Sequence, residues 1–334
     1  KMRGRTPVPG KAWVMAPEVA LLVEAALRGD HRSVRQACAT ALADGYDVAD
    51  LVVEVLAPVQ REVGRRWLVG EATVADEHRA TAGLDSILAA VELDLPPSTR
   101  RGPVICVCAE GEWHAAAARM MALVMVSRGW PVVFLGPSLP AADLAAVARE
   151  TDAAAVAVSA GTVAALPGVA RCVRAVSEAG RPVLVGGHAF LAVPAAAQAL
   201  GAPLFADPRD AAGAVETLPL ARAPVGLGEQ EVLALDAVEP HLVRRTAEAL
   251  RSRHGVDPAG RPALHEAAGY VVGFARAAIL LRDRSVVSSH LGWLEAFVSS
   301  RGLGISGPDL LEGLDVAGRE ALEDPCLLHD VLAD

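Results

Sequence analysis

The sequence lacks features that mark several classes of protein. It contains no uninterrupted apolar run of about 18 residues, the length that a membrane-spanning helix needs. Its 31 Lys and Arg residues are interspersed with 40 Asp and Glu residues, and the net charge is −9. Nucleic-acid-binding proteins instead carry a clustered basic surface. The basic start of the chain has no apolar segment of the kind found in signal peptides. We therefore expect contact with neither a membrane nor a nucleic acid.

Cysteines are few and scattered. Cys106 and Cys108 stand two residues apart in a strand-like run and form no C-x-x-C motif, the usual mark of zinc or redox sites. The five cysteines are an odd number and are spread over the chain. We expect the cysteines to be small buried residues in a protein of the reducing cytoplasm.

Three zones of different composition divide the chain. The sequence is 52% hydrophobic, so each zone can bury a core of its own. Pro/Gly-containing breaks near residues 96–98 and 223–226 give boundaries of 13–98, 99–222 and 225–334. The first and last zones show helical spacing, whereas the middle zone alternates strand-like and helical segments. The predicted fold class is α/β plus all-α.

The first zone predicts four helices joined by short turns. The third helix spans about 48–67 and carries Pro58, and the fourth opens at 73–76, which has the form of a capping box. Helices connected in this way form an up-and-down bundle.

The middle zone predicts a parallel, doubly wound sheet. Its strands are apolar on both faces and alternate with helices. The predicted strands are 104–109, 131–135, 154–159, 182–185 and 203–206. A flavodoxin-like order 2-1-3-4-5 suits five strands and places the ligand at the carboxyl ends of strands one and three.

Polar and glycine residues follow the carboxyl ends of these strands. His114, at the start of a helix, is the candidate metal ligand, and Glu112 can hold its second ring nitrogen. Glycines at the other strand ends let a ligand approach the backbone. A helix cap or surface histidine is the alternative for His114. The cofactor-binding candidates at this edge are Gly111, Glu112, Trp113, His114, Ser138, Leu139, Ser159, Gly161, Thr162, Gly186 and Gly187.

The segment 111–114 resembles the Asp-x-His-x-x-Gly signature of cobalamin-binding domains, with Glu112 standing for the Asp. The resemblance implies that His114 displaces dimethylbenzimidazole from cobalt and that the displaced tail enters the crevice of the sheet. Ser159 and the pair Gly186-Gly187 match the family's residues beside that tail. Ala117 stands where the signature has its final Gly, and Gly161 stands where Leu is usual.

A second signal lies in the predicted bundle. The spacing from Trp67 to Glu77-His78 resembles the Trp-x9-Glu-His pattern of B12 photoreceptors of the light-dependent repressor type. The resemblance implies a cap over the upper face of adenosylcobalamin, with Trp67 against the adenosyl group and Glu77 and His78 on its ribose. A core Trp beside an exposed Glu-His pair is the alternative. Those relatives carry a His after the Trp where this chain has Leu68, which puts a bis-histidine photoproduct in doubt. No helix-turn-helix module precedes residue 13.

The third zone predicts about five helices that concentrate histidine, arginine and aromatic residues. Such helices can hold a flat tetrapyrrole whose propionates pair with arginine. The architecture resembles the photocobilins, in which a globin-like domain binds biliverdin beside the B12 domain. His265, Arg276, His290 and Trp293 are the bilin-binding candidates, and the absence of cysteine between Cys172 and Cys326 favours non-covalent attachment. A helical packing or dimerisation module is the alternative.

The resemblances imply a light sensor rather than an enzyme. We expect adenosylcobalamin and biliverdin as cofactors, a homo-oligomer whose assembly changes with light, and a separate effector protein. A corrinoid methyl carrier is the second hypothesis, and a scaffold without a cofactor is the third. Trp67 and Glu77 favour the sensor, because a methyl group offers no ribose to bind.

Overall fold

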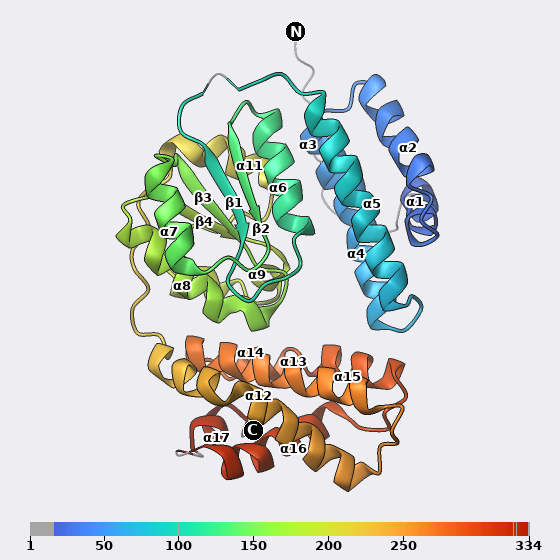
Figure 1. The fold of residues 1–334 in the computed structure, drawn as a ribbon, viewed down its shortest axis with the longest axis vertical. Coiled ribbons are helices and arrows are strands. Elements are labelled where there is room, and N and C mark those ends of the chain that lie inside the picture. The colour runs from blue at the N-terminus through green and yellow to red at the C-terminus, as the bar shows by residue number, and fades with distance from the viewer. Residues whose placement is uncertain (1–16, 99, 323, 325, 333–334) are drawn as a thin grey trace.

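The computed structural model describes residues 17–98, 100–322, 324 and 326–332. It has three parts: a helical bundle, an α/β unit beside it, and a helical C-terminal part beneath both (Figure 1). The predicted start of the first zone at residue 13 lies outside the described residues.

The predicted four-helix bundle is confirmed, although its third helix is composite. The third helix begins as α3, continues as a π-helical segment and ends as α4. At Ala57 the backbone N–H bonds to the carbonyl of Val52, five residues earlier. Pro58 follows and has no N–H to donate, which favours the wider turn. The predicted capping box between Thr73 and Asp76 is present at the start of α5. The bundle consists of α1 (Pro17–Leu27), α2 (His31–Ala43), α3 (Val48–Asp50), η1 (Leu51–Leu56), α4 (Ala57–Leu68) and α5 (Val74–Leu93).

Four parallel strands form the sheet in the described residues, in the order β2-β1-β3-β4. They are β1 (Val104–Cys108), β2 (Val132–Gly136), β3 (Ala155–Ser159) and β4 (Val183–Gly186). The order agrees with the predicted one for these strands. The predicted fifth strand is wrong: Leu204 makes only an isolated bridge to Val185. Pro203 has no N–H for a ladder, and Asp207 already caps the next helix, so the segment is too short to pair further.

Helices cover both faces of the sheet. Ile105 and Val107 of β1 point to the face that packs on α7 and α8, whereas Val104 and Cys106 point to the face of α6, α11 and the bundle. This alternation gives two cores. The helical segments of this unit are α6 (Ala116–Ser127), α7 (Ala141–Glu150), η2 (Val163–Ala165), α8 (Leu166–Glu178), α9 (His188–Ala192), α10 (Ala195–Ala199), α11 (Pro208–Ala214) and η3 (Val215–Thr217).

The C-terminal part is helical, as predicted, and a globin-like arrangement stays a prediction. Its elements are α12 (Glu229–His254), α13 (Arg261–Leu281), α14 (Ser285–Ser288), α15 (Leu291–Ser300), α16 (Gly307–Ala321) and α17 (Cys326–Leu332). The continuous helix predicted for 284–300 is wrong, because it is interrupted between α14 and α15 at Ser289 and His290. There the ring of His290 donates to the backbone carbonyl of Val286 at 2.7 Å.

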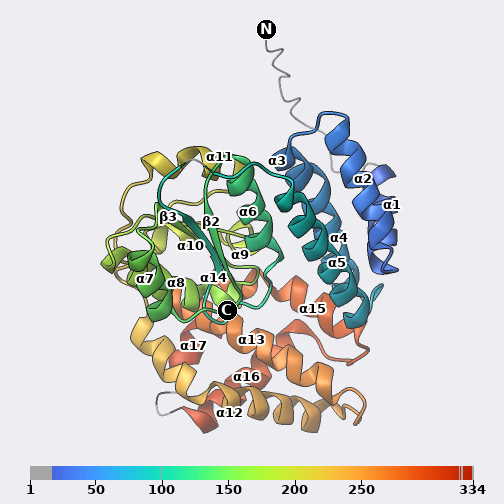
Figure 2. The same ribbon diagram turned by 45° about the horizontal axis from the view of Figure 1, so that its top comes forward.

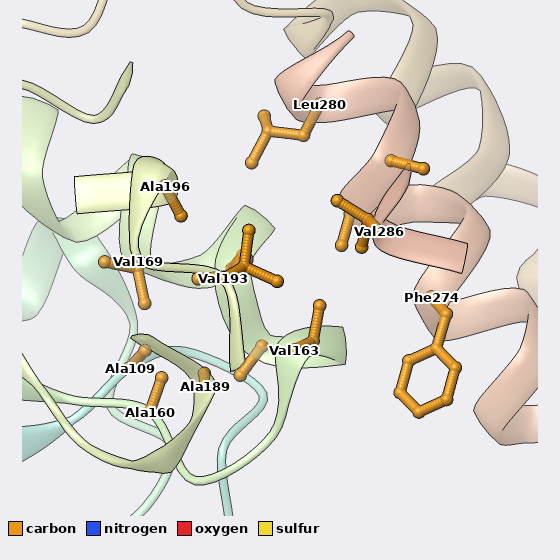
Figure 3. Close-up of a cluster of buried hydrophobic side chains, with 14 of the residues drawn as sticks. Ala109, Ala160, Val163, Val169, Ala189, Val193, Ala196, Phe274, Leu280 and Val286 are labelled. Carbon is orange, nitrogen blue, oxygen red and sulfur yellow. The ribbon is translucent and has the colours of Figure 1, made fainter. Parts of the chain in front are cut away.

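The C-terminal part shares its core with the α/β unit. Phe274, Leu280 and Val286 face Val163 and Val193 across the boundary (Figure 3). Helix α13 is long and apolar enough to cross a membrane by length and composition alone, but 67% of its most apolar window is buried within the fold. A core helix passes the same test. Its apolar surface therefore has partners inside the protein.

Candidate functional site

The candidate site lies at the carboxyl edge of the sheet. Strand β1 pairs with both β2 and β3, so the loops that follow these strands leave the edge side by side. The end of the bundle formed by α4 and α5 and the helices α13 and α15 approach the same edge (Figures 1 and 2). All three parts of the chain therefore meet around the loop that carries His114.

His114 is held by one side of the Glu112 carboxylate. Oε1 of Glu112 accepts from the ring Nδ1 of His114 at 2.6 Å and from its backbone N–H at 2.8 Å. An ionised carboxylate only accepts, so Nδ1 carries a proton and Nε2 is left for a metal. The His114 side chain is 67% exposed, whereas Glu112 is 1% exposed. The predicted contact between Glu112 and the second ring nitrogen is therefore present.

The other side of the same carboxylate ties this loop to the loop after β3. Oε2 of Glu112 accepts from the backbone N–H of Gly161 at 2.7 Å, from that of Thr162 at 2.9 Å and from the Thr162 hydroxyl at 3.4 Å. A Cβ on Gly161 would lie 3.3 Å from both Oε2 of Glu112 and Cβ of His114. Glycine at this position permits the close approach. Glu112 thus fixes the orientation of His114 relative to two neighbouring strands.

The charges of this pair reinforce each other. Burial alone would raise the pKa of Glu112, but the hydrogen bond and charge of His114, with the backbone N–H groups of His114 and Thr162, hold it below its usual value. The hydrogen bond to Glu112 raises the pKa of His114, burial opposes this, and the charges of Glu112 and Glu77 add to the rise. Glu77 belongs to α5, so the charge of a bundle carboxylate acts on His114.

Ser138 and Leu139 bring in the loop after β2. The Ser138 hydroxyl accepts from the backbone N–H of Gly111 at 3.1 Å, and the Ser138 N–H donates to the carbonyl of Glu112 at 2.9 Å. Ser138 has a φ of 51°, which is uncommon for a residue with a side chain. Leu139 is partly buried against the core. These contacts hold the 111–114 segment from the side opposite to Gly161.

Ser159 and Gly187 suit a ligand that enters the sheet. The Ser159 hydroxyl is buried at the end of β3 and has no hydrogen-bond partner, which is costly unless a ligand supplies one. Gly187 has a φ of 103°, and a Cβ there would lie 2.3 Å from the carbonyl oxygen of Ala160. Gly186, at the end of β4, is buried. An unpartnered hydroxyl beside a histidine with a free Nε2 fits the donor set that a corrinoid needs, because the corrin ring supplies the other cobalt ligands.

Trp113 completes the histidine loop on its outer side. It is 73% exposed, an uncommon position for a tryptophan. The described residues contain no group of three or more His, Cys, Asp or Glu side chains that could hold a metal ion.

Trp67 and Glu77 lie at the same end of the bundle and are partly buried, whereas His78 is largely exposed. Glu77 is 23% exposed and its Oε1 accepts from the hydroxyl of Thr81 at 2.8 Å, whereas His78 is 76% exposed. His78 lies 3.7 Å from the Oε2 of Glu77. Trp67 is partly buried and packs on the core that the C-terminal part shares with the sheet. Trp67 and Glu77 are thus brought together at one end of the bundle.

The surroundings of Trp67 were not predicted from the sequence. Its ring lies 5.9 Å from that of Phe297, and the Arg301 guanidinium lies over it at 4.9 Å from the ring centre. Both partners belong to the C-terminal part, more than two hundred residues away in the sequence. No local pattern marks them; only the concentration of aromatic residues in 262–300 pointed to this region.

The four bilin candidates fall into two groups. His290 and Trp293 join a cluster of rings with Phe274, at 4.8 and 5.9 Å between centres. Arg276 is paired instead with Asp236 of α12 at 2.5 Å and with Glu239 at 2.8 Å. His265 is exposed and stands nine residues before Phe274 on α13, which places it half a turn away from the rings. The structure therefore does not bring the four candidates to one surface.

His290 has a pKa below its usual value. Burial is the main cause and the charge of His188 adds to the lowering, whereas the hydrogen bond to the backbone carbonyl of Val286 opposes it. His188 begins α9, directly after Gly187. Phe274 of the ring cluster faces Val163, which follows the loop after β3 (Figure 3), so the cluster lies near the edge of the sheet that carries the candidate site.

Two family models match this chain. Residues 19–92 match one model described as a B12 binding domain, and residues 102–214 match a second with the same description. The first segment contains Trp67 and Glu77, and the second contains His114 and the other candidates at the sheet edge. Residues 225–334 lie outside both matches. No curated protein sequence shows significant similarity to the chain.

Solved structures share part of the fold. The monomethylamine corrinoid protein of Methanosarcina barkeri is 17% identical, with a TM-score of 0.51 over 60% of this chain and 97% of that one. A cobalamin-binding protein from Desulfitobacterium hafniense DCB-2 is 18% identical, with a TM-score of 0.33 over 58% and 95% of the two chains. The methanol:cobalamin methyltransferase complex MtaBC of Methanosarcina barkeri is 19% identical, with a TM-score of 0.32 over 63% and 88%. The first of these similarities shows the fold alone.

Proposed function

We propose that this chain, which carries two B12-binding domains, is a light sensor that holds adenosylcobalamin between the end of its bundle and the carboxyl edge of its sheet. His114 would ligate cobalt through Nε2, with Nδ1 kept on Glu112. Trp67 would pack against the adenosyl group and Glu77 would bind its ribose; His78, which is 76% exposed, would have to turn toward the ligand to bind the ribose as well. The proposal assigns no catalytic residue.

The observation that carries the choice of adenosylcobalamin is the presence of Trp67 and Glu77 at the end of the bundle that approaches the sheet edge (Figure 1). The charge of Glu77 also contributes to the raised pKa of His114. Thr81 holds one oxygen of Glu77, and the carboxylate remains partly exposed. A carboxylate and an aromatic ring above the metal suit an upper ligand that has hydroxyls and a flat base.

Adenosylcobalamin, when bound, supplies a cobalt–carbon bond that light breaks. The task of the chain is to couple the loss of the upper ligand to its own packing. Trp67 would lose a packing partner on its site side while keeping Phe297 on the other. We expect the bundle end to shift, the assembly state of a homo-oligomer to change, and a separate effector to respond.

Selectivity between two cobalamins tests the upper face. Wild type should bind adenosylcobalamin more tightly than methylcobalamin, and Glu77→Gln should lose about tenfold for the former only, since one hydrogen bond to a charged group contributes ~1.5 kcal/mol. Asp85→Asn, a change of an exposed carboxylate on the same helix, is the matched control. Equal wild-type affinities would contradict the assignment of the upper face.

Light dependence is tested by size-exclusion chromatography before and after green light. We expect a change of assembly state with adenosylcobalamin and none with hydroxocobalamin. With Leu68 after Trp67, the spectrum after illumination should show water or a distant histidine on cobalt. An elution profile that light leaves unaltered would remove the sensor function while leaving cobalamin binding intact.

A methyl carrier is the second candidate. The observation that favours it is the fold shared with the monomethylamine corrinoid protein over 97% of that chain. A methyl carrier should bind methylcobalamin at least as tightly as adenosylcobalamin and tolerate Glu77→Gln, so the selectivity experiment separates the two. A purified protein that takes up no corrinoid colour would instead favour the scaffold hypothesis.

Biliverdin on the C-terminal part is a further element of the proposal. The partly buried rings of His290 and Trp293 pack on the buried ring of Phe274 and would supply the aromatic surface. Arg276 would have to exchange Asp236 and Glu239 for a propionate. Adding biliverdin to the full chain should give a red-shifted, sharpened band that is lost on denaturation, since attachment is expected to be non-covalent. Absence of the band would favour the packing-module alternative.

A further inference from the structure

The last turn of α4 depends on side chains from the C-terminal part. A helix end leaves its final carbonyls without intrahelical partners. The Trp67 carbonyl accepts from the backbone N–H of Gly70 at 3.2 Å. The Arg301 guanidinium adds hydrogen bonds from one nitrogen to the carbonyls of Trp67 at 3.1 Å and Leu68 at 2.9 Å. The Ser300 hydroxyl donates to the Leu68 carbonyl at 2.8 Å. A cation at this end also interacts favourably with the helix dipole.

The same guanidinium fixes the indole ring. Its central carbon lies 4.9 Å from the centre of the Trp67 ring and 4.4 Å from that of Phe297, distances typical of cation–π contacts. One side chain therefore restrains both the backbone of Trp67 and the plane of its ring. Lysine could supply the charge but not the planar, multiply donating group.

The C-terminal part that carries Arg301 also contacts the sheet side of the site. Helix α13 contacts the 163–165 turn, and a Cβ on Gly273 would lie 2.6 Å from Cβ of Ala164. That turn follows Thr162, whose N–H holds Glu112. The C-terminal part thus contacts the 163–165 turn at the sheet edge through α13 and the end of the bundle through α15 (Figures 1 and 2). It sets the position of the bundle end relative to the sheet edge.

We infer that Arg301 is a positioning residue that holds Trp67 over the upper face, so that the C-terminal part helps to select the upper ligand of the cobalamin. The inference rests on the proposed function, because it needs Trp67 to contact that ligand. Arg301 itself need not touch the cofactor. Without it, the end of α4 loses two hydrogen bonds and the ring loses its cationic neighbour.

The test compares Arg301→Ala, Arg301→Lys and a matched control in full-length protein. Arg319→Ala removes an arginine that is 64% exposed and pairs with Asp315 on its own helix. Arg301→Ala should weaken adenosylcobalamin binding about tenfold, or ~1.4 kcal/mol, and leave hydroxocobalamin binding unchanged. Arg301→Lys should fall between the two, and Arg319→Ala should match wild type.

A second readout needs no cofactor. In the apoprotein, hydrogen exchange of the backbone amides at 68–72 should become faster in Arg301→Ala than in Arg319→Ala, because the end of α4 frays. Arg301→Lys, which keeps a donor, serves if Arg301→Ala does not fold, and circular dichroism checks the fold of each variant.

The outcomes separate the two proposals. A wild-type preference for adenosylcobalamin that persists in Arg301→Ala overturns the inference alone. Exchange at 68–72 that does not change in either Arg301 variant also overturns it. A wild type that binds adenosylcobalamin and hydroxocobalamin equally overturns the proposed upper-face contact and this inference with it.

Discussion

Replacing Glu112 by glutamine changes one atom of the side chain and removes an acceptor from a buried network. The Glu112 carboxylate accepts from the N–H and Nδ1 of His114 on one oxygen, and from Gly161 and Thr162 on the other. A glutamine has one accepting oxygen, and its NH₂ group only donates. Either the two His114 donors or the Gly161 and Thr162 donors must therefore face another donor.

The magnitude follows from the number of donors left without a partner. Each unsatisfied buried group costs about 1–3 kcal/mol. One orientation of the amide leaves the N–H groups of Gly161 and Thr162 without an acceptor, and the other leaves the N–H of His114 without one. We expect Glu112→Gln to lower the free energy of unfolding of the apoprotein by ~1–4 kcal/mol. If the NH₂ faces the ring, Nδ1 of His114 becomes the acceptor and the proton moves to Nε2, where cobalt would bind. Loss of such a supporting contact typically weakens metal binding about 10–100-fold.

Urea denaturation of the apoprotein and titration with cobalamin measure the two effects. Glu110→Gln is the matched control, because Glu110 lies on the same loop, is 36% exposed, and pairs only with Arg171 at 3.1 Å among its side-chain contacts. That change should cost less than about 1 kcal/mol and leave the spectrum of bound cobalamin unaltered. Should Glu112→Gln keep wild-type stability and the wild-type spectrum, the assignment of His114 as an oriented ligand would be refuted.

Three further predictions concern the same region. Gly187→Ala should reduce the free energy of unfolding by ~3 kcal/mol, because a Cβ would approach the Ala160 carbonyl to 2.3 Å at a φ of 103°; wild-type stability in urea would refute this. Ser159→Ala should leave apoprotein stability unchanged or slightly higher, since the buried hydroxyl has no partner. The same change should weaken cobalamin binding in a titration, and an unchanged affinity would contradict the role of Ser159. Burial and the charge of His188 depress the pKa of His290, so its contribution to stability is present above its unfolded pKa of about 6.5 and lost as pH falls through the lowered value. Denaturation at pH 7.5 and at lower pH should show a smaller decline for His290→Asn than for wild type, and equal declines would argue against this titration.

Local sequence determined the elements and the loop chemistry. Strands that are apolar on both faces can be buried only in a covered parallel sheet, which places the residues that follow 108 and 159 at one edge. The contact between Glu112 and His114 spans two residues, so spacing alone could predict it. The capping box of α5 and the up-and-down order of the bundle are equally local. The sequence also predicts that Trp67 and Glu77 lie at one end of the bundle, because a short turn joins the end of α4 to the start of α5.

Tertiary structure decided which of these residues have partners from elsewhere. The spacing on α13 offered Arg276 as a donor for a ligand, but Asp236 and Glu239 of α12 neutralise it. The capping of α4 by Arg301 spans 234 residues from the Trp67 carbonyl. Helical periodicity reports which residues share a face of one helix, and it carries no information on which helix that face will meet. Such pairs depend on how the three parts pack around the sheet edge, so only the structure reveals that the C-terminal part contacts the Trp67 end of the bundle.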